Sequence, residues 1–172
     1  MKKLSKTVFA ISVIAASTTC IAGAYNGQMA EQRHWAGQGA VTTDGASLGL
    51  VYYGDVWEMG VTGAGKYDND SDETRLFTPA IFAGRRINLA ENTEFAYGLG
   101  FSSKFGKDDG EDIDSAYGAG PYISLEQHLT PNLILSAWVE PYYYEYEKKD
   151  GDSTTTHSFF STGGIALSYL FA

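Results

Sequence analysis

Histidine and serine are the residue types in this chain that could perform nucleophilic chemistry, and their spacing decides against it. His157 and Ser158 are adjacent, and adjacent residues of a β-strand point to opposite faces. His157 and Ser161 are four residues apart, which is about 13 Å along a strand. That separation is too large for the hydrogen bond between a nucleophile and its base. The sequence therefore predicts no catalytic residues and a protein that is not an enzyme.

Acidic residues that could bind a metal gather in two clusters, over residues 68–73 and 108–114. An EF-hand calcium loop needs Gly at its sixth position and a bidentate Glu at its twelfth. Counting from Asp68 gives Glu73 and Pro79 at those positions. We therefore expect neither a metal nor a cofactor, and we interpret both clusters as solvated loops.

The elements that must position these residues are β-strands. After residue 35 the chain alternates large apolar side chains with small or polar ones, which is the period of a strand. Residues 95–105 show this most clearly, and residues 117–125, 133–143 and 162–171 repeat it. In the first stretch one face carries Phe95, Tyr97, Leu99 and Phe101, and the other carries Ala96, Gly98, Gly100 and Ser102.

Segments rich in Gly, Asp and Asn divide these strands and alternate between two lengths. Residues 54–55, 88–92 and 129–132 are short dividers, whereas residues 66–73, 106–114 and 148–156 are longer and mostly acidic. A first strand over residues 35–41 and a tight connection over residues 42–45 bring the count to eight strands. An even strand number with short turns at one end and longer loops at the other is typical of membrane barrels. The sequence predicts an all-β fold, an eight-stranded antiparallel up-and-down transmembrane β-barrel.

The two faces of the strands indicate which side meets lipid. A soluble barrel such as a lipocalin keeps its large apolar residues inside. Here one face is unusually small, and a narrow eight-stranded barrel has little interior space for side chains. Aromatic residues gather at the strand ends, as in the girdles of membrane barrels. They are Tyr52, Tyr53 and Trp57 at one end, and Phe105, Tyr117, Tyr143 and Tyr146 at the other.

Charged residues within the strands predict a network inside the barrel. Glu58, Lys104 and Glu140 fall on the small-residue face. Arg86 belongs to a strand whose facing the pattern leaves open, together with Arg75 and Arg85. Because a buried charge needs a partner, we expect Glu58, Lys104, Glu140 and Arg86 to form salt bridges that plug the lumen. The alternative is a thin polar conduit, against which the aromatic residues of the same face argue: Tyr122, Trp138, Tyr142 and Tyr144.

The first 24 residues have the order of a cleaved signal peptide. Three lysines at positions 2, 3 and 6 precede an uncharged apolar run, and small residues follow over residues 22–24. The run is too short for a spanning helix, which needs about 20 apolar residues. Cys20 lacks the neighbours of a lipidation site and would leave with this segment. We expect a signal peptide over residues 1–24, a periplasmic lead-in over residues 25–34 and the barrel over residues 35–172.

Charge excludes one class of partner. Loss of the three lysines leaves nine basic against 21 acidic residues, a net charge of −12. A nucleic-acid-binding protein needs a basic surface, so we expect no nucleic-acid partner.

The end of the chain carries a family resemblance. Residues 165–171 resemble the closing strand of bacterial outer-membrane proteins, with Tyr169 and Phe171 at the matching aromatic positions, although Ala172 extends past the usual aromatic end. In size and strand count the mature chain is similar to the small OmpX/OmpA-type barrels. The resemblance implies the Gram-negative outer membrane, periplasmic termini, contact with lipid and lipopolysaccharide, recognition of Tyr169 and Phe171 by the assembly machinery, and a monomer.

The function expected from these features is that of an integral outer-membrane β-barrel with a plugged lumen. It would serve envelope integrity or surface interaction through its acidic extracellular loops. The first alternative is a narrow porin-like channel. The second is a lipid A-modifying enzyme, since similar barrels deacylate lipid A with a His, Ser and acid set. His34 and His128 lie in the lead-in and a periplasmic turn, away from lipid A in the outer leaflet.

Overall fold

The computed structural model describes residues 34–43, 45–68, 74–108, 111–149, 151–160 and 162–171. The predicted signal peptide, the lead-in up to residue 33, and Ala172 lie outside these residues. The strands are β1 (His34–Thr42), β2 (Gly45–Tyr53), β3 (Trp57–Asp68), β4 (Thr74–Ala90), β5 (Thr93–Asp108), β6 (Glu111–Thr130), β7 (Leu133–Glu140), β8 (Tyr143–Lys149), β9 (Asp152–Ser158) and β10 (Thr162–Leu170). The described residues contain no helix long and apolar enough to cross a membrane.

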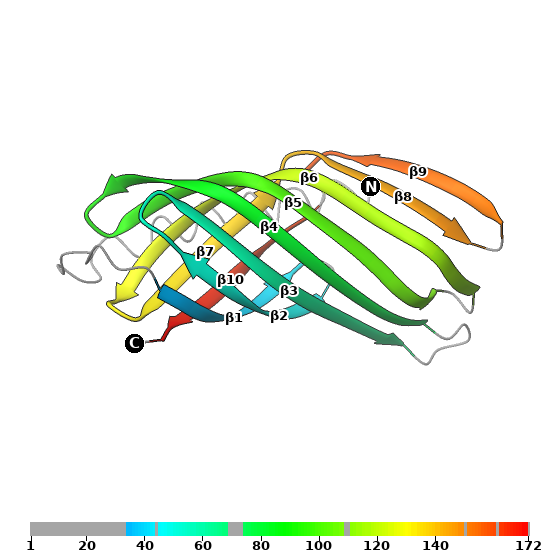
Figure 1. Ribbon diagram of the computed structural model, residues 1–172, viewed down its shortest axis with the longest axis horizontal. Coiled ribbons are helices and arrows are strands. Elements are labelled where there is room, and N and C mark those ends of the chain that lie inside the picture. Colours follow the sequence, from blue (N-terminus) through cyan, green and yellow to red (C-terminus); the bar gives the residue numbers. More distant parts are fainter. Residues whose placement is uncertain are drawn as a thin grey trace.

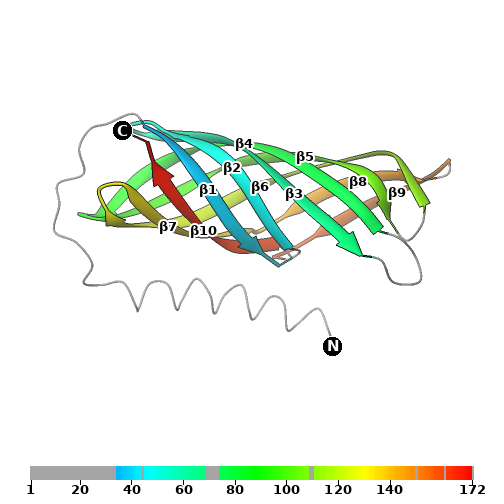
Figure 2. The same cartoon turned by 90° about the horizontal axis from the view of Figure 1, so that it is seen from below.

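These segments close into an antiparallel barrel (Figures 1 and 2). Each strand from β1 to β6 pairs with the next along the chain, and β10 pairs with β1. Both β7 and β8 pair with β6, so together they form one barrel strand that is interrupted at Pro141. In the same way β9 and β10 form the last barrel strand. The expected all-β, eight-stranded barrel is confirmed, and β1 includes the predicted first strand.

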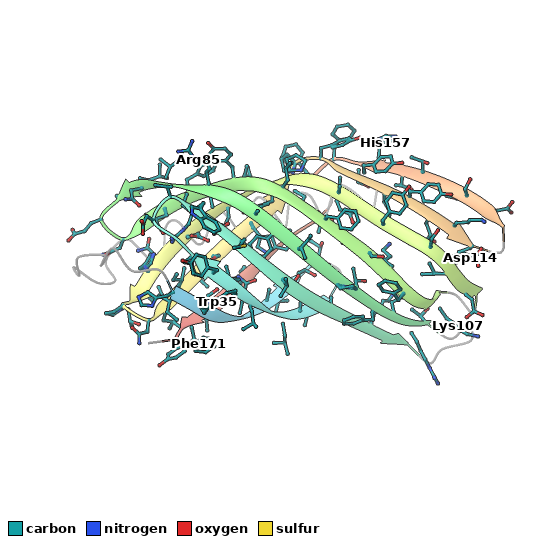
Figure 3. All side chains as sticks on the ribbon, viewed as in Figure 1. Trp35, Arg85, Lys107, Asp114, His157 and Phe171 are labelled. Atoms are coloured by element: carbon teal, nitrogen blue, oxygen red, sulfur yellow. The ribbon has the colours of Figure 1, made fainter. Side chains whose placement is uncertain are left out.

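Exposure follows the predicted alternation. On β5, Ala96 is completely buried, whereas Leu99 is 69% exposed on the outer face. On β4 the pattern settles the facing that the sequence left open. Arg86 points into the barrel, and Arg75 and Arg85 point outward. Figure 3 shows the Arg85 side chain directed away from the barrel wall.

The expected facing of Tyr142 and of Tyr143 and Tyr144 at the start of β8 is wrong. Tyr143 points inward, because its hydroxyl lies 2.5 Å from Ser102 Oγ. Tyr142 and Tyr144 instead contact the exposed His157. The reason is the break at Pro141, since proline has no N–H for the sheet and interrupts the ladder. The last barrel strand is interrupted at the same level, between β9 and β10, where the Phe160 amide lies 3.3 Å from the Pro141 carbonyl. An irregular step between β7 and β8 exchanges inward and outward positions.

The connections have the expected lengths at one end of the barrel and are shorter than expected at the other. At one end, the turns after β2, β4 and β6 are short, as predicted. At the other end, the strands continue through most of the expected acidic loops, so that β5 reaches Asp108 and β6 begins at Glu111. Strands β3 to β6, with β8 and β9, extend beyond the short β1–β2 hairpin (Figure 1). Charged residues are compatible with strand structure where the sheet faces water on both sides.

Candidate functional site: the barrel lumen

A guanidinium surrounded by carboxylates lies at the end of the lumen near the short turns. Arg86 Nε lies 3.1 Å from Glu126 Oε2 and 4.0 Å from Glu58 Oε2, and Arg86 also bonds Glu94 through its terminal nitrogen. The Glu94 carboxylate is 3.2 Å from His128 Nε2. We call Glu58, Arg86, Glu94, Glu126 and His128 the floor cluster. Its arginine and carboxylate side chains are at most 7% exposed.

Strand register explains why these side chains meet. Glu94 and Glu126 are direct partners across β5 and β6, and Glu58 faces Gly84 across β3 and β4. Residues opposite one another in a sheet share a face, so four neighbouring strands direct their charges to one point. A planar guanidinium with five N–H donors can satisfy several carboxylates at once. Arg86 also donates to the Gly54 carbonyl at 3.2 Å and lies over the Tyr53 ring.

Two aromatic rings lie beside the floor cluster on the inner face of the barrel. The Tyr122 hydroxyl donates to Glu58 Oε1 at 2.7 Å, and its ring packs edge-on against Phe82 with centroids 5.6 Å apart. These rings occupy space that glycines leave open. A Cβ at Gly60 would come within 2.5 Å of Phe82, and one at Gly98 would lie 2.7 Å from Tyr122. Glycines on the inner face therefore leave room for these two rings.

The four residues predicted to form one lumen network are divided by the structure. Arg86 and Glu58 are brought together in the floor cluster. Lys104 lies toward the other end, where it bonds Glu145 and is 3.8 Å from Glu147. Glu140 lines the space between, with a carboxylate oxygen 3.8 Å from the position of a Cβ at Gly100. The sequence did not predict that Phe82 points into the lumen. Its cross-strand partners Gly60 and Gly100 were the available signal, because glycines leave room for a large inward ring.

A cavity of about 1080 Å³ occupies the lumen beyond the floor cluster. It extends from Tyr53, Glu58 and Glu126 to the tip of the β1–β2 hairpin and to β9. The described side chains therefore leave this part of the lumen open. Among the residues that the structure describes, no group of three or more His, Cys, Asp or Glu has an arrangement that could hold a metal ion.

The outer surface carries an apolar belt bounded by aromatic residues. At the end with short turns, the Tyr52 ring contacts both Trp35 and Trp57, with centroids 5.3 and 5.4 Å apart. At the other end, Tyr117 stacks on Tyr146 at 5.1 Å. Figure 3 shows Trp35 and Phe171 near one end of the barrel, and Lys107 and Asp114 near the other.

The two residues of the predicted assembly signal lie on the outer face of the last strand. Tyr169 is 55% and Phe171 48% exposed, and their rings contact each other with centroids 6.4 Å apart. The Phe171 amide donates to the Trp35 carbonyl at 2.8 Å, which joins the end of the chain to β1.

The histidine that was weighed as a catalytic base has an aromatic environment. His157 Nδ1 lies 2.7 Å from the Tyr142 hydroxyl, and its ring also contacts Tyr144. Ser158, its neighbour in the chain, is opposite Tyr143 in the register and shares that residue's inward face. This geometry contains no pairing of His157 with Ser158.

Comparison with known proteins gives similarity at the level of structure. No family model and no curated sequence matches the chain. Outer membrane protein H (OprH) of P. aeruginosa, solved in DHPC micelles, matches with a TM-score of 0.57 and 14% identity over 81% of this chain and 100% of that one. Neisserial surface protein A (NspA) matches with a TM-score of 0.49 and 18% identity over 81% of this chain and 94% of that one. The chain therefore has the fold of the small eight-stranded barrels found among outer-membrane proteins.

Proposed function

We propose that this protein is an integral β-barrel of the Gram-negative outer membrane, delivered by a signal peptide over residues 1–24. The exposed apolar belt supports this, because such a surface is unfavourable in water and suited to hydrocarbon. The aromatic pairs at both ends match interfacial girdles. Both termini are then periplasmic, since the chain ends beside the short turns, with Tyr169 and Phe171 as the assembly signal.

We further propose that the barrel does not conduct and is not an enzyme, and that it serves envelope integrity or surface interaction. One observation carries the closed lumen: the floor cluster and the Phe82–Tyr122 pair together fill the barrel near its periplasmic end. A pore would require these buried charges to separate, and each would then lose its partner. The protein acts as a monomer, because closure between β1 and β10 leaves no sheet edge within the barrel wall.

Contacts with other molecules would be made at the external end. There β9 pairs with β8, and on the outer face Lys107 Nζ lies 3.5 Å from Asp112 Oδ1. These extended strands, rather than long acidic loops, present charge of both signs. Lipopolysaccharide is the partner we propose for the outer surface at this level, together with the lipid that surrounds the belt.

Conductance in planar bilayers, combined with lipid A mass analysis of cells with and without the protein, tests this function. We expect no single-channel current and no change in lipid A. Steady current from the wild-type protein would replace the closed barrel with the narrow porin-like channel. Protein-dependent loss of an acyl chain would replace it with a lipid A-modifying enzyme.

A further inference from the structure

The lumenal cavity is a pocket with one closed end. Its volume of about 1080 Å³ is slightly above the usual range for small-molecule sites, which is about 300–1,000 Å³. The floor cluster closes it toward the periplasm, and it reaches the external rim at the β1–β2 hairpin. A ligand would therefore enter and leave from outside the cell.

One polar atom in this pocket lacks a partner. Ser136 is 4% exposed, and among the described residues its Oγ has no hydrogen-bond partner. Ser136 lines the cavity and lies directly opposite Glu126 in the β6–β7 register. Buried hydroxyl groups are almost always hydrogen-bonded. The Ser136 hydroxyl is therefore available to bond a group that approaches from the cavity, beside a carboxylate.

The charges of the pocket indicate the sign of that group. The lining contains four carboxylates against two ammonium groups, namely Glu58, Glu126, Glu140 and Glu145 against Lys66 and Lys104. Lys104 is occupied by Glu145 and Glu147, and in the floor cluster one guanidinium serves three carboxylates. The pocket therefore favours a cation.

Strand β7 arranges the polar groups along a line. Ser136, Trp138 and Glu140 alternate onto the inner face and all line the cavity. Ser136 and Glu140 are about 13 Å apart along the strand, and the indole between them offers an apolar and cation-binding surface. A hydroxyl and a carboxylate at the two ends, separated by an aromatic ring, fit an aliphatic chain with an ammonium group at each end.

We propose that the lumen binds a small aliphatic diammonium ion from the external side. One ammonium group donates to Ser136 Oγ and the Glu126 carboxylate, and the other donates to Glu140. The aliphatic chain lies over Trp138. This inference rests on the closed floor of the proposed function, and it adds a ligand class to a lumen that would otherwise be only structural.

Binding can be followed by the fluorescence of Trp138, which lines the cavity. The other two tryptophans, Trp35 and Trp57, are exposed on the outer face, so a Trp35→Phe, Trp57→Phe background isolates the fluorescence of Trp138. Titration of the refolded, detergent-solubilised barrel with cadaverine should give a saturable change. Pentanediol and glutarate, which have the same carbon chain with neutral or anionic ends, should give none. Pentylamine, with a single ammonium group, should bind at least about tenfold more weakly.

Two variants locate the site. Glu140→Gln and Ser136→Ala should each weaken cadaverine binding by about tenfold or more, while Glu91→Gln, which removes a charge at the exposed β4–β5 turn, should leave it unchanged. Ser136→Ala should fold as well as wild type, because it deletes an unpartnered hydroxyl. Folding is checked by the shift in gel mobility on heating.

Binding of all four probes alike, no saturable binding by the wild-type barrel, or equal affinity in the three variants would overturn the inference. Its failure is separable from failure of the proposed function. A barrel that conducts but binds cadaverine contradicts only the closed lumen. One that neither conducts nor binds contradicts only the diammonium pocket.

Discussion

Replacement of Arg86 tests whether the floor cluster holds the barrel closed. Arg86→Gln leaves Glu58, Glu94 and Glu126 without their shared guanidinium. All four side chains are at most 7% exposed, so water screens the remaining carboxylates poorly. Removal of one partner from a buried ion pair costs about 3–5 kcal/mol. Because three carboxylates depend on this cation, we expect the free energy of unfolding to fall by about 4 kcal/mol or more.

The neighbouring arginine provides a matched control. Arg85→Gln makes the same chemical change one residue away, but Arg85 points outward. Its loss should cost about 1 kcal/mol or less, as for exposed charges. Urea unfolding in detergent micelles, followed by tryptophan fluorescence and by gel mobility, measures both variants under one condition.

A combined variant separates lost charge from lost packing. Adding Glu94→Gln and Glu126→Gln to Arg86→Gln removes two of the carboxylates left without a cation. If their uncompensated buried charge causes the loss, the triple variant should regain at least half of the stability, because neutral amides can hydrogen-bond one another. The reasoning fails if Arg86→Gln and Arg85→Gln lower the unfolding free energy to within about 1 kcal/mol of each other, or if the triple variant is less stable than Arg86→Gln.

Further predictions concern the plug, the upper ion pair and the topology. Gly60→Val should cost about 1–3 kcal/mol by overpacking against Phe82, a ring atom of which lies 2.5 Å from the added Cβ. Gly65→Val, where a Cβ meets its nearest atom at 4.0 Å, should be nearly neutral. Urea midpoints measure both variants, and equal losses would contradict the close packing of Phe82 in the lumen. Lys104→Gln should cost about 1 kcal/mol or less, because this pair is partly exposed, and a loss as large as that of Arg86→Gln would contradict two separate clusters. In intact cells an impermeant thiol reagent should label Ser153→Cys but not Glu91→Cys, and the reverse pattern would invert the barrel.

Local patterning made the barrel predictable. Successive side chains of a strand point to opposite faces whatever the rest of the chain does. The alternation from Phe95 to Ser102 is therefore sufficient to assign an apolar outer and a small inner face, and the structure agrees. Strand number and barrel closure follow from counting such segments. The prediction of aromatic girdles at the strand ends was wrong for two of its residues. Tyr53 is 3% exposed and its hydroxyl donates to Ser168 Oγ inside the barrel, and Tyr143 also points inward.

Register and irregularity were decided only in the tertiary structure. Which carboxylates surround Arg86 depends on the stagger of β3 to β6, and no single strand contains that information. Lys104 has the same parity as Glu94 on β5, but about 33 Å of strand separates them, and Lys104 lies beside Glu145 instead. At Pro141, pairing of the two broken strands reverses the facing of Tyr143, which strict alternation cannot anticipate. The sequence by itself determined the alternation of an apolar outer face and a small inner face along each regular strand. The tertiary structure decided the facing next to the break at Pro141 and which inner side chains meet, because contacts across a sheet depend on register between segments far apart in the chain.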